Sequence, residues 1–274
     1  MSKVVILAGG RGTRLAEETT LRPKPMVEIG GVPILAHIMA TYAQFGHHDF
    51  LVACGYMGDF IANYFAQWQA GAILQPERNS ATIRSIQNVW SVGCIDTGLD
   101  SLTGGRVLRL REYLQDDAFM VTYGDGVCDI DIDQLLDFHK SHGRLATVTA
   151  VRPPARWGAL VMEGDEVRAF AEKCAGMENW INGGYFVFEP EILDYLTDDS
   201  TILEREPLEK LAKQGQLMAY KHPNFWQPMD TIHERDVLRK AWDSNTAAWA
   251  TDAHEFTKWA INSYGITPAR KQAA

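Results

Sequence analysis

The amino-acid sequence predicts a single α/β domain, in which a mostly parallel sheet carries helices on both faces. Three observations lead to this fold class. The chain has 274 residues and no internal repeat, which suits one large domain with at most a small appendage. Val4–Ala8 is a continuous, β-branched-rich apolar run that leads into glycines, as buried parallel strands do. Strand-like and helix-like patterns then alternate along the chain.

The elements of the first half follow from apolar runs and their punctuation. A helix is expected from about Pro33, because proline suits the first turn of a helix, and Gly46 marks its end. Phe50–Cys54 predicts the next strand and Ile61–Phe65 the next helix. One face of the first helix would carry Ile34, Leu35, Ile38, Met39 and Tyr42.

The second half is expected to begin with an irregular polar excursion over residues 75–102. Regular structure then resumes, and the residues after about Trp249 are expected to be peripheral, with a frayed tail. The predicted elements are a helix at Gly105–Leu114, a strand at Phe119–Thr122, a helix at Asp131–His142, a strand at Ala146–Val151, short strands between Trp157 and Phe188, and helices near Pro190–Leu196 and Leu203–Lys213.

Composition and charge exclude several classes of protein. The net charge of −9 argues against a protein that coats nucleic acid, which needs a basic face. No apolar run is long enough for a membrane-spanning helix, and the N-terminal run is too short for a signal peptide, so we expect no membrane partner and a cytoplasmic location. The four cysteines are widely spaced and are expected to be reduced, buried thiols rather than metal ligands.

A glycine-rich loop follows the first strand and is the first candidate site. Three glycines in four positions let the backbone approach a ligand closely, and such a loop at the carboxyl end of a parallel strand can point several N–H groups at phosphate. Neither a dinucleotide fingerprint nor a Walker loop fits, and a tight turn without ligand remains an alternative. The predicted nucleotide-binding residues here are Leu7, Ala8, Gly9, Gly10, Arg11, Gly12, Thr13 and Arg14.

Lys24 is held between two prolines, Pro23 and Pro25, which stiffen the backbone on both sides. A lysine fixed in this way, ten residues after Arg14, favours a phosphate-binding role. The alternative is a solvated surface charge.

Two aspartates are candidate metal ligands. Asp125 lies between Gly124 and Gly126 at the end of a predicted buried strand, where space is clear for a metal that holds a triphosphate. An ordinary Asp-Gly turn is the alternative. Asp230 precedes a predicted helix that begins near Thr231, so a helix-capping role competes with metal binding.

The glycine loop and the Pro-Lys-Pro-Met segment together resemble the signature of the nucleoside-diphosphate-sugar pyrophosphorylases, or sugar nucleotidylyltransferases. The resemblance covers about residues 3–245. It implies a Rossmann-like, doubly wound fold with a smaller sugar-binding β region, and transfer of a nucleotidyl group to a sugar phosphate. It also implies Arg14, Lys24 and Asp125 as catalytic residues, with Mg²⁺ on Asp125 and Asp230.

The same resemblance implies a sugar-phosphate site in the second half of the chain. Its predicted residues are Gly158, Glu172, Lys173 and Asn182, with Lys173 on the sugar phosphate. Cys174 stands where the family usually has proline, which leaves the local loop shape open. Residues 1–130 would mainly bind the nucleotide, residues 131–245 would mainly bind the sugar phosphate, and residues 246–274 would form a peripheral segment.

Within the family, the segment from Thr103 to Arg106 resembles the cytidylyltransferase branch, which implies CTP and glucose 1-phosphate as substrates. Thr103, Gly124 and, one helical turn after Arg106, Arg109 are further nucleotide-binding candidates. Use of dTTP or UTP, or a non-catalytic regulatory subunit of the same fold, are the alternatives. The resemblance also implies a homo-oligomer, a hexamer in this branch.

Overall fold

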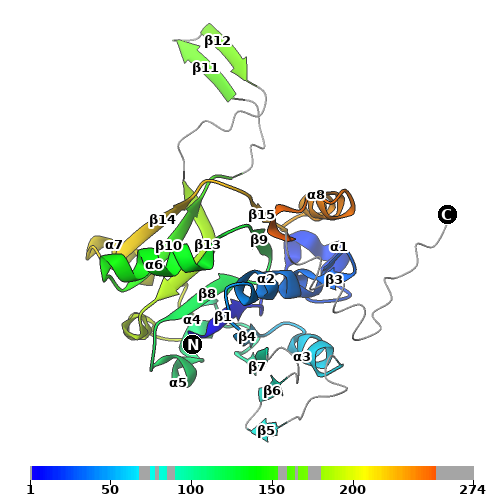
Figure 1. The fold of residues 1–274 in the computed structure, drawn as a ribbon, viewed down its shortest axis with the longest axis vertical. Helices are drawn as coiled ribbons and strands as arrows, with labels where there is room; N and C mark the ends of the chain where they lie inside the picture. Colours follow the sequence, from blue (N-terminus) through cyan, green and yellow to red (C-terminus); the bar gives the residue numbers. More distant parts are fainter. Residues whose placement is uncertain are drawn as a thin grey trace, which may run out of the picture.

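The fold, seen in a computed structural model, centres on a twisted sheet (Figure 1). The structure describes residues 2–67, 75–77, 80–84, 90–153, 159–163, 166–171 and 180–250. Within them, nine strands form the main sheet, and the order from edge to edge is β14 (Leu217–His222), β10 (Ala146–Val151), β13 (Ile181–Phe188), β8 (Phe119–Tyr123), β1 (Val4–Leu7), β4 (Asp49–Cys54), β7 (Ser91–Asp96), β6 (Ser80–Arg84) and β5 (Gln75–Glu77).

Most strands of this sheet point the same way. β8, β1, β4 and β7 are parallel neighbours, as are β10 and β14, whereas β13 and β6 run against their neighbours. The carboxyl ends of β1, β4, β7 and β8 therefore share one edge, where ligands bind in open α/β sheets. The predicted mostly parallel, doubly wound sheet is confirmed.

Side chains that alternate along the strands build one core on each face of the sheet. Val4 and Ile6 of β1 join one cluster, and Val5 between them joins the other. The helices that cover the two faces are α2 (Ile34–Ala43), α3 (Gly58–Gln67), α6 (Ile132–His142) and α8 (Ile232–Asp243) on the first, and α4 (Thr103–Leu108), α5 (Arg111–Leu114), α7 (Glu206–Lys213) and the 3₁₀ helix η3 (Pro190–Tyr195) on the second.

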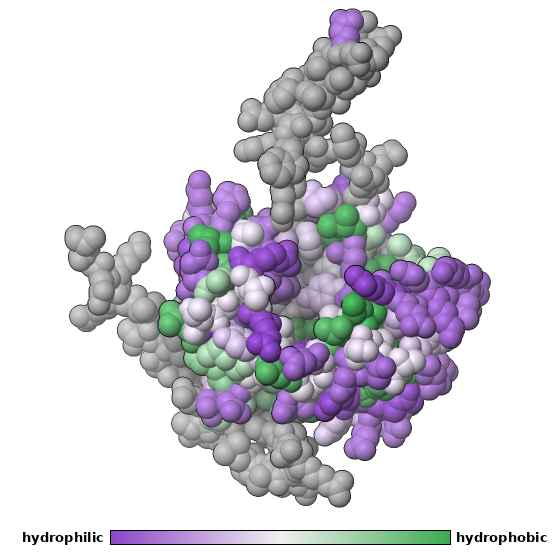
Figure 2. Space-filling model, turned by 180° about the vertical axis from the view of Figure 1, so that it is seen from behind, coloured by the Kyte–Doolittle hydropathy of each residue, from purple (hydrophilic) through white to green (hydrophobic). Residues whose placement is uncertain are grey.

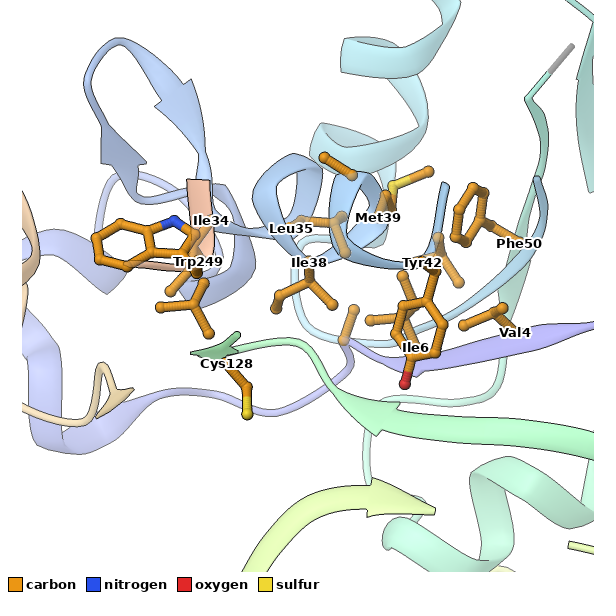
Figure 3. Close-up of a cluster of buried hydrophobic side chains, with 14 of the residues drawn as sticks. Val4, Ile6, Ile34, Leu35, Ile38, Met39, Tyr42, Phe50, Cys128 and Trp249 are labelled. Atoms are coloured by element: carbon orange, nitrogen blue, oxygen red, sulfur yellow. The ribbon is translucent and has the colours of Figure 1, made fainter. Parts of the chain in front are cut away.

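Helix α2 shares one core cluster with β1 and β4, and Figure 3 shows Ile38 and Tyr42 on the side of the helix that faces β1. The five residues predicted for its buried face are all buried, and Pro33 precedes its first residue. Burial of each large apolar side chain contributes about 1.5–3 kcal/mol. The strong apolar pattern is therefore what specifies this helix.

Small elements surround the main sheet. The remaining ones are the helix α1 (Ala16–Thr19), the 3₁₀ helices η1 (Thr13–Leu15), η2 (Lys24–Met26) and η4 (Ala248–Ala250), and three two-stranded pairs: β2 (Glu28–Ile29) with β3 (Val32–Pro33), β15 (Trp226–Pro228) with β9 (Gly126–Cys128), and β11 (Ala159–Glu163) with β12 (Glu166–Ala171). In Figure 1 the β11–β12 hairpin is drawn apart from the main sheet.

Two expectations about elements were wrong. The segment expected to be an irregular excursion contains β7, which pairs with β4 along its whole length. Its sequence hides this role, because Gly93 packs its backbone against Leu51 and interrupts the apolar run. The helix expected at Gly105–Leu114 begins at Thr103 and is divided into α4 and α5, with Leu110 buried at the break.

The surface and the end of the described chain complete the picture. On the face that Figure 2 shows, the coloured residues are mostly hydrophilic, with hydrophobic residues in separate patches. Trp249 is buried and stacks on Phe225, whereas residues 251–274 lie outside the described residues. Within the described residues, no helix has the length and apolar character needed to cross a membrane.

Candidate functional site

The glycine-rich loop leaves β1 at the carboxyl edge of the sheet. Gly12 has φ +61°, and a β-carbon there would lie 2.8 Å from Thr19 and 3.1 Å from Lys24. Glycine is therefore required at this position for both its conformation and its packing. The Thr19 hydroxyl donates to the Gly12 carbonyl oxygen at 3.1 Å, which ties the loop to helix α1.

Arg106 supports the glycine loop from below. Its guanidinium is buried, at 5% exposure, and donates to neutral oxygen atoms, among them the carbonyl oxygen of Gly9 at 3.0 Å. Further bonds reach the carbonyl oxygens of Cys54 and Gly98 and the Thr97 hydroxyl, at 2.8–3.0 Å. Burial lowers the pKa of Arg106 from its usual high value. This buried positive charge thus holds the loop to the ends of β4 and β7.

Lys24 is the central cation of the site. It begins the 3₁₀ helix η2 between the two prolines and is only 8% exposed. Its Nζ donates to Asp125 Oδ2 and to Asp230 Oδ1, both at 2.6 Å. Burial acts to lower the pKa of Lys24, but the two carboxylates outweigh it and raise the pKa above its ordinary value. Lys24 is therefore charged and buried, and a solvated surface charge does not describe it.

The two aspartates meet because β9 and β15 are paired. Pro228 lies opposite Gly126, so Asp125, just before β9, faces the residues that follow β15. The Met229 amide donates to the Asp125 carbonyl oxygen at 2.8 Å, and Asp230 comes next in the chain. Residues 105 positions apart in the sequence thus place their carboxylates around a single lysine.

Helix α8 does not need Asp230 as its cap. Thr231 is the N-cap, and it forms a capping box with Glu234. The Asp230 carboxylate instead pairs with Lys24 and, at 3.0 Å, with Arg14 of the glycine loop. The capping alternative for Asp230 was wrong. Likewise, the Asp125 side chain does more than shape a turn, since it pairs with Lys24.

Two adjoining cavities open on this edge of the sheet. The first, about 350 Å³, lies over the glycine loop, and the second, about 580 Å³, lies beside β13. Four residues line both: Arg14, Thr103, Tyr123 and Asp125. Two ligands, one in each cavity, would therefore meet at Asp125.

Most of the predicted residues line these cavities. Those at the first are Leu7, Ala8, Gly9, Gly10, Gly12, Thr13, Arg14, Lys24, Thr103, Gly124 and Asp125. Asn182 and Asp230 line the second. Gly158, Glu172 and Lys173 lie outside the described residues.

Two predicted arginines lie away from the two cavities. Arg11 pairs with Asp100 at 3.1 Å on the surface, and Arg109 pairs with Asp199. Neither is among the residues that line the two cavities. Their predicted contact with a nucleotide therefore needs a rearrangement of these surface pairs.

Sequence reasoning missed several lining residues. Arg106 and Ser101 line the first cavity, Glu204 lines the second, and Tyr123 lines both. The segment that contains Arg106 was used only to predict the nucleotide base. The buried position of Arg106 beneath the glycine loop was not predicted. Glu204 carried no local signal, because only the fold brings it to Thr103 and Tyr123.

The donor set at Lys24 fits a divalent metal. Two carboxylates, one just before β9 and one just after β15, direct oxygens at one cation, and Mg²⁺ takes one or two carboxylates together with substrate phosphates. A second group, Cys128, Asp129 and His222, also brings its ligand atoms within 4.8 Å of one another. Burial raises the pKa of the Cys128 thiol, and thiol and imidazole are poor ligands for Mg²⁺. The aspartate pair is thus the better match for Mg²⁺.

Comparison with known proteins identifies the family to which the chain belongs. The model of the nucleotidyl transferase family matches residues 3–232. Glucose-1-phosphate cytidylyltransferase of Salmonella typhi is 49% identical over 91% of this chain and 99% of its own length. The probable glucose-1-phosphate cytidylyltransferase of Bacillus subtilis (strain 168) is 38% identical over 90% of this chain and 98% of its own length.

A solved structure shows the same fold. The crystal structure of HddC from Yersinia pseudotuberculosis complexed with GMP-PN has a TM-score of 0.64 and covers 88% of this chain and 100% of its own, at 23% sequence identity. This likeness concerns the fold alone. The family match and the two curated relatives confirm the family predicted from the glycine loop and the Pro-Lys-Pro-Met segment: the chain belongs to the nucleotidyl transferase family.

Proposed function

We propose that this protein transfers a cytidylyl group from CTP to α-D-glucose 1-phosphate and forms CDP-glucose and pyrophosphate. The observation that carries the proposal is the pair of cavities that meet at Asp125, with two cations and two carboxylates at their junction. Such a site suits a reaction between two anions. The 49% identity to a glucose-1-phosphate cytidylyltransferase supports these two substrates.

We assign the nucleotide to the first cavity and the sugar phosphate to the second. The first is lined by residues 7–25 and 101–125 only, and it contains the glycine loop, which suits a triphosphate. The second is lined largely by residues 122–230, including Asn182 on β13. The division of the chain at about residue 130 stays a prediction, and Arg14, Thr103, Tyr123 and Asp125, all before that residue, line both cavities.

The chemistry requires positioning more than proton transfer. An oxygen of the sugar phosphate attacks the α-phosphorus of CTP, and the bond from that phosphorus to the bridging oxygen breaks, so pyrophosphate leaves with the electron pair. The attacking oxygen is already an anion, and no base is needed. Alignment of the two anions and stabilisation of the charge on the leaving group therefore provide most of the rate.

Arg14 and Lys24 are the cations that pair with the two aspartates at the junction of the cavities. Asp125 and Asp230 balance them, so the four groups sum to zero charge before substrate binds. We assign Arg14 to the triphosphate and Lys24 to the charge that develops between the α-phosphoryl group and pyrophosphate. Each must exchange a carboxylate for a phosphate oxygen when the nucleotide binds.

Asp125 and Asp230 are the residues that would hold Mg²⁺, and the metal would supply positive charge to the phosphates. In the structure both carboxylates pair with Lys24, so Lys24 and the metal would compete for them. Lys173, outside the described residues, stays our candidate for the anchor of the sugar phosphate, with Glu172, Gly158 and Asn182 at the sugar.

The rival proposals differ in clear ways. A non-catalytic subunit of the same fold is disfavoured, because Arg14, Lys24, Asp125 and Asp230 converge on one point, which a regulatory role does not require. Use of dTTP or UTP is disfavoured by the Thr103–Arg106 segment and by the identity to the cytidylyltransferases. We also propose that the protein is cytoplasmic and forms a homo-oligomer. Light scattering of the purified protein, which gives its molar mass in solution, tests the assembly.

The experiment is a reaction of the purified protein with Mg²⁺, CTP and glucose 1-phosphate, followed by mass spectrometry and a pyrophosphate assay. We expect CDP-glucose and pyrophosphate in equal amounts, and none without the sugar phosphate. Absence of product with CTP, but formation of a nucleotide sugar with dTTP or UTP, would overturn the choice of base. Absence of product with every common nucleoside triphosphate would overturn the enzymatic proposal.

A further inference from the structure

Glu204 connects the two cavities through a chain of hydrogen bonds. Its Oε2 accepts from the Thr103 hydroxyl at 2.6 Å, and its Oε1 accepts from the Tyr123 hydroxyl. Thr103 and Tyr123 each line both cavities, and Glu204 itself lines the second. The carboxylate is thus placed where the proposed nucleotide and sugar sites adjoin.

The direction of each hydrogen bond is fixed. The Thr103 hydroxyl oxygen accepts from the Leu203 amide at 3.0 Å, so its own proton goes to Glu204. The Tyr123 hydroxyl oxygen accepts from Asn182 Nδ2 at 3.0 Å, so its proton also goes to Glu204. The Thr103 bond, on the nucleotide side, and the Tyr123 bond, on the sugar side, therefore each require an acceptor oxygen on residue 204.

Tyr123 and Asn182, on the sugar side, depend on Glu204 more than Thr103, on the nucleotide side, does. Helix α4, which carries Thr103, is tied to residues 199–201 by backbone bonds from Leu102, Gly104 and Gly105. Gly105 also packs against the Asp199 backbone, where a β-carbon would lie 2.4 Å from the carbonyl oxygen. Thr103 hence stays in place without Glu204.

Asn182 has fewer constraints of its own. It is exposed at the start of β13, its Oδ1 accepts from the Gly184 amide at 2.8 Å, and its Nδ2 donates to Tyr123. The Gly184 amide fixes Oδ1, and Nδ2 keeps its place at the second cavity while Tyr123 offers it a lone pair. Tyr123 offers that lone pair because Glu204 takes its proton.

We propose that Glu204 is a positioning residue that determines recognition of the sugar, because it orients Tyr123 and, through it, the Asn182 amide. The inference rests on the proposed function, which assigns the sugar phosphate to the second cavity. Glu204→Gln keeps the size of the side chain but replaces one acceptor oxygen with an NH₂ donor. One of the two hydroxyls then faces a donor and must turn its proton away.

The test is steady-state kinetics of Glu204→Gln with CTP and glucose 1-phosphate. Loss of one hydrogen bond to a charged group corresponds to about a tenfold change or more in binding. We expect the KM for glucose 1-phosphate to rise by about tenfold, with the KM for CTP and kcat within about threefold of the unchanged protein. Glu206→Gln, an exposed carboxylate two residues away that lines neither cavity, is the matched control and should leave all constants unchanged.

A second variant keeps the proposal open to refutation if Glu204→Gln does not fold. Tyr123→Phe removes the hydroxyl that links Glu204 to Asn182 and should raise the KM for glucose 1-phosphate by a similar factor. In the double variant the two effects should not add, because both break the same chain.

Several results would overturn the inference. One is an unchanged KM for glucose 1-phosphate in folded Glu204→Gln. Another is a lower kcat, a higher KM for both substrates and a lower Tm, since that combination marks a purely structural role. Full additivity with Tyr123→Phe is a third. The unchanged protein in the same assay tests the proposed function separately, because its failure to make CDP-glucose would refute that function and not the role of Glu204.

Discussion

Gly9 and Gly10 are neighbours in the glycine-rich loop, but the structure gives them opposite reasons to be glycine. A β-carbon at Gly9 would lie 2.1 Å from Nη1 of Arg106, whereas one at Gly10 would meet nothing within 4 Å. Neither has a positive φ, so alanine fits the backbone conformation of both. We predict that Gly9→Ala destabilises the protein and that Gly10→Ala affects nucleotide binding alone.

The size of the Gly9 effect follows from the contacts of Arg106. Ordinary contact begins at 3.4 Å, so the guanidinium must move by about 1.3 Å, the difference between 3.4 and 2.1 Å. Its bonds of 2.8–3.0 Å to Gly9, Thr97 and Gly98 do not survive such a shift. Since each bond to a charged group is worth about 1.5–3 kcal/mol, loss of two costs about 3 kcal/mol or more. For a chain of this size that lowers Tm by about 6–12 °C.

Gly10 should respond differently because it is exposed and lines the first cavity. The methyl group added by alanine would meet no other protein atom within 4 Å, but it would block the path by which the triphosphate approaches the loop. Gly10→Ala should therefore change Tm by less than about 2 °C and raise the KM for CTP by about tenfold, the effect of one lost phosphate contact.

Thermal unfolding and CTP titration of both variants provide the assay. Each glycine variant is the matched control for the other. Equal Tm losses in both variants would refute the role given to Arg106. An unchanged KM for CTP in Gly10→Ala would refute close approach of the nucleotide to the loop.

Three further predictions concern single groups. Lys24→Met should lower kcat by about 10² while it strengthens Mn²⁺ binding in the absence of nucleotide, measured by calorimetry, because the competing ammonium is gone; unchanged Mn²⁺ affinity contradicts this. Lys173→Ala should chiefly raise the KM for glucose 1-phosphate, and an unchanged value moves the anchoring role elsewhere. Burial lowers the pKa of His139 even though Glu189 acts against it, so the unfolded chain takes up the proton first and the free energy of unfolding falls as pH drops below about 6.5. Urea unfolding of His139→Gln should show a flatter pH dependence, and an equal slope argues against it.

Apolar periodicity predicted the parts of the fold that bury continuous faces. β1, α2, β8 and α6 were found at or within a residue or two of their expected positions, since each carries a strong apolar run or stripe. β7 was missed because Gly93 and polar ends break its pattern, although its three central residues are buried and it pairs with β4 along its whole length. Tertiary pairing, which no local pattern reports, decided that strand.

The site was predictable where its residues stood in motifs. The glycine loop and Lys24 were found from local sequence, and Asp230 from family resemblance, because its partner Asp125 is 105 residues away. Helical spacing placed Arg106 and Arg109 on one face, but Arg109 lies at the end of α4 and turns to Asp199, while Arg106 turns inward. Glu204 is positioned entirely by long-range contacts, so only the folded structure reveals it.

Asp125 and Asp230 are proposed to form the catalytic metal site at the junction of the two cavities. The most direct measurement is kcat for Asp125→Asn and Asp230→Asn with CTP, glucose 1-phosphate and Mg²⁺. Asp236→Asn on helix α8, which lines neither cavity, is the control. Because a metal–phosphate interaction is worth several kcal/mol, each site variant should lose about 10² or more in kcat, with folding retained by circular dichroism and the control fully active. Full activity of either site variant would contradict the account.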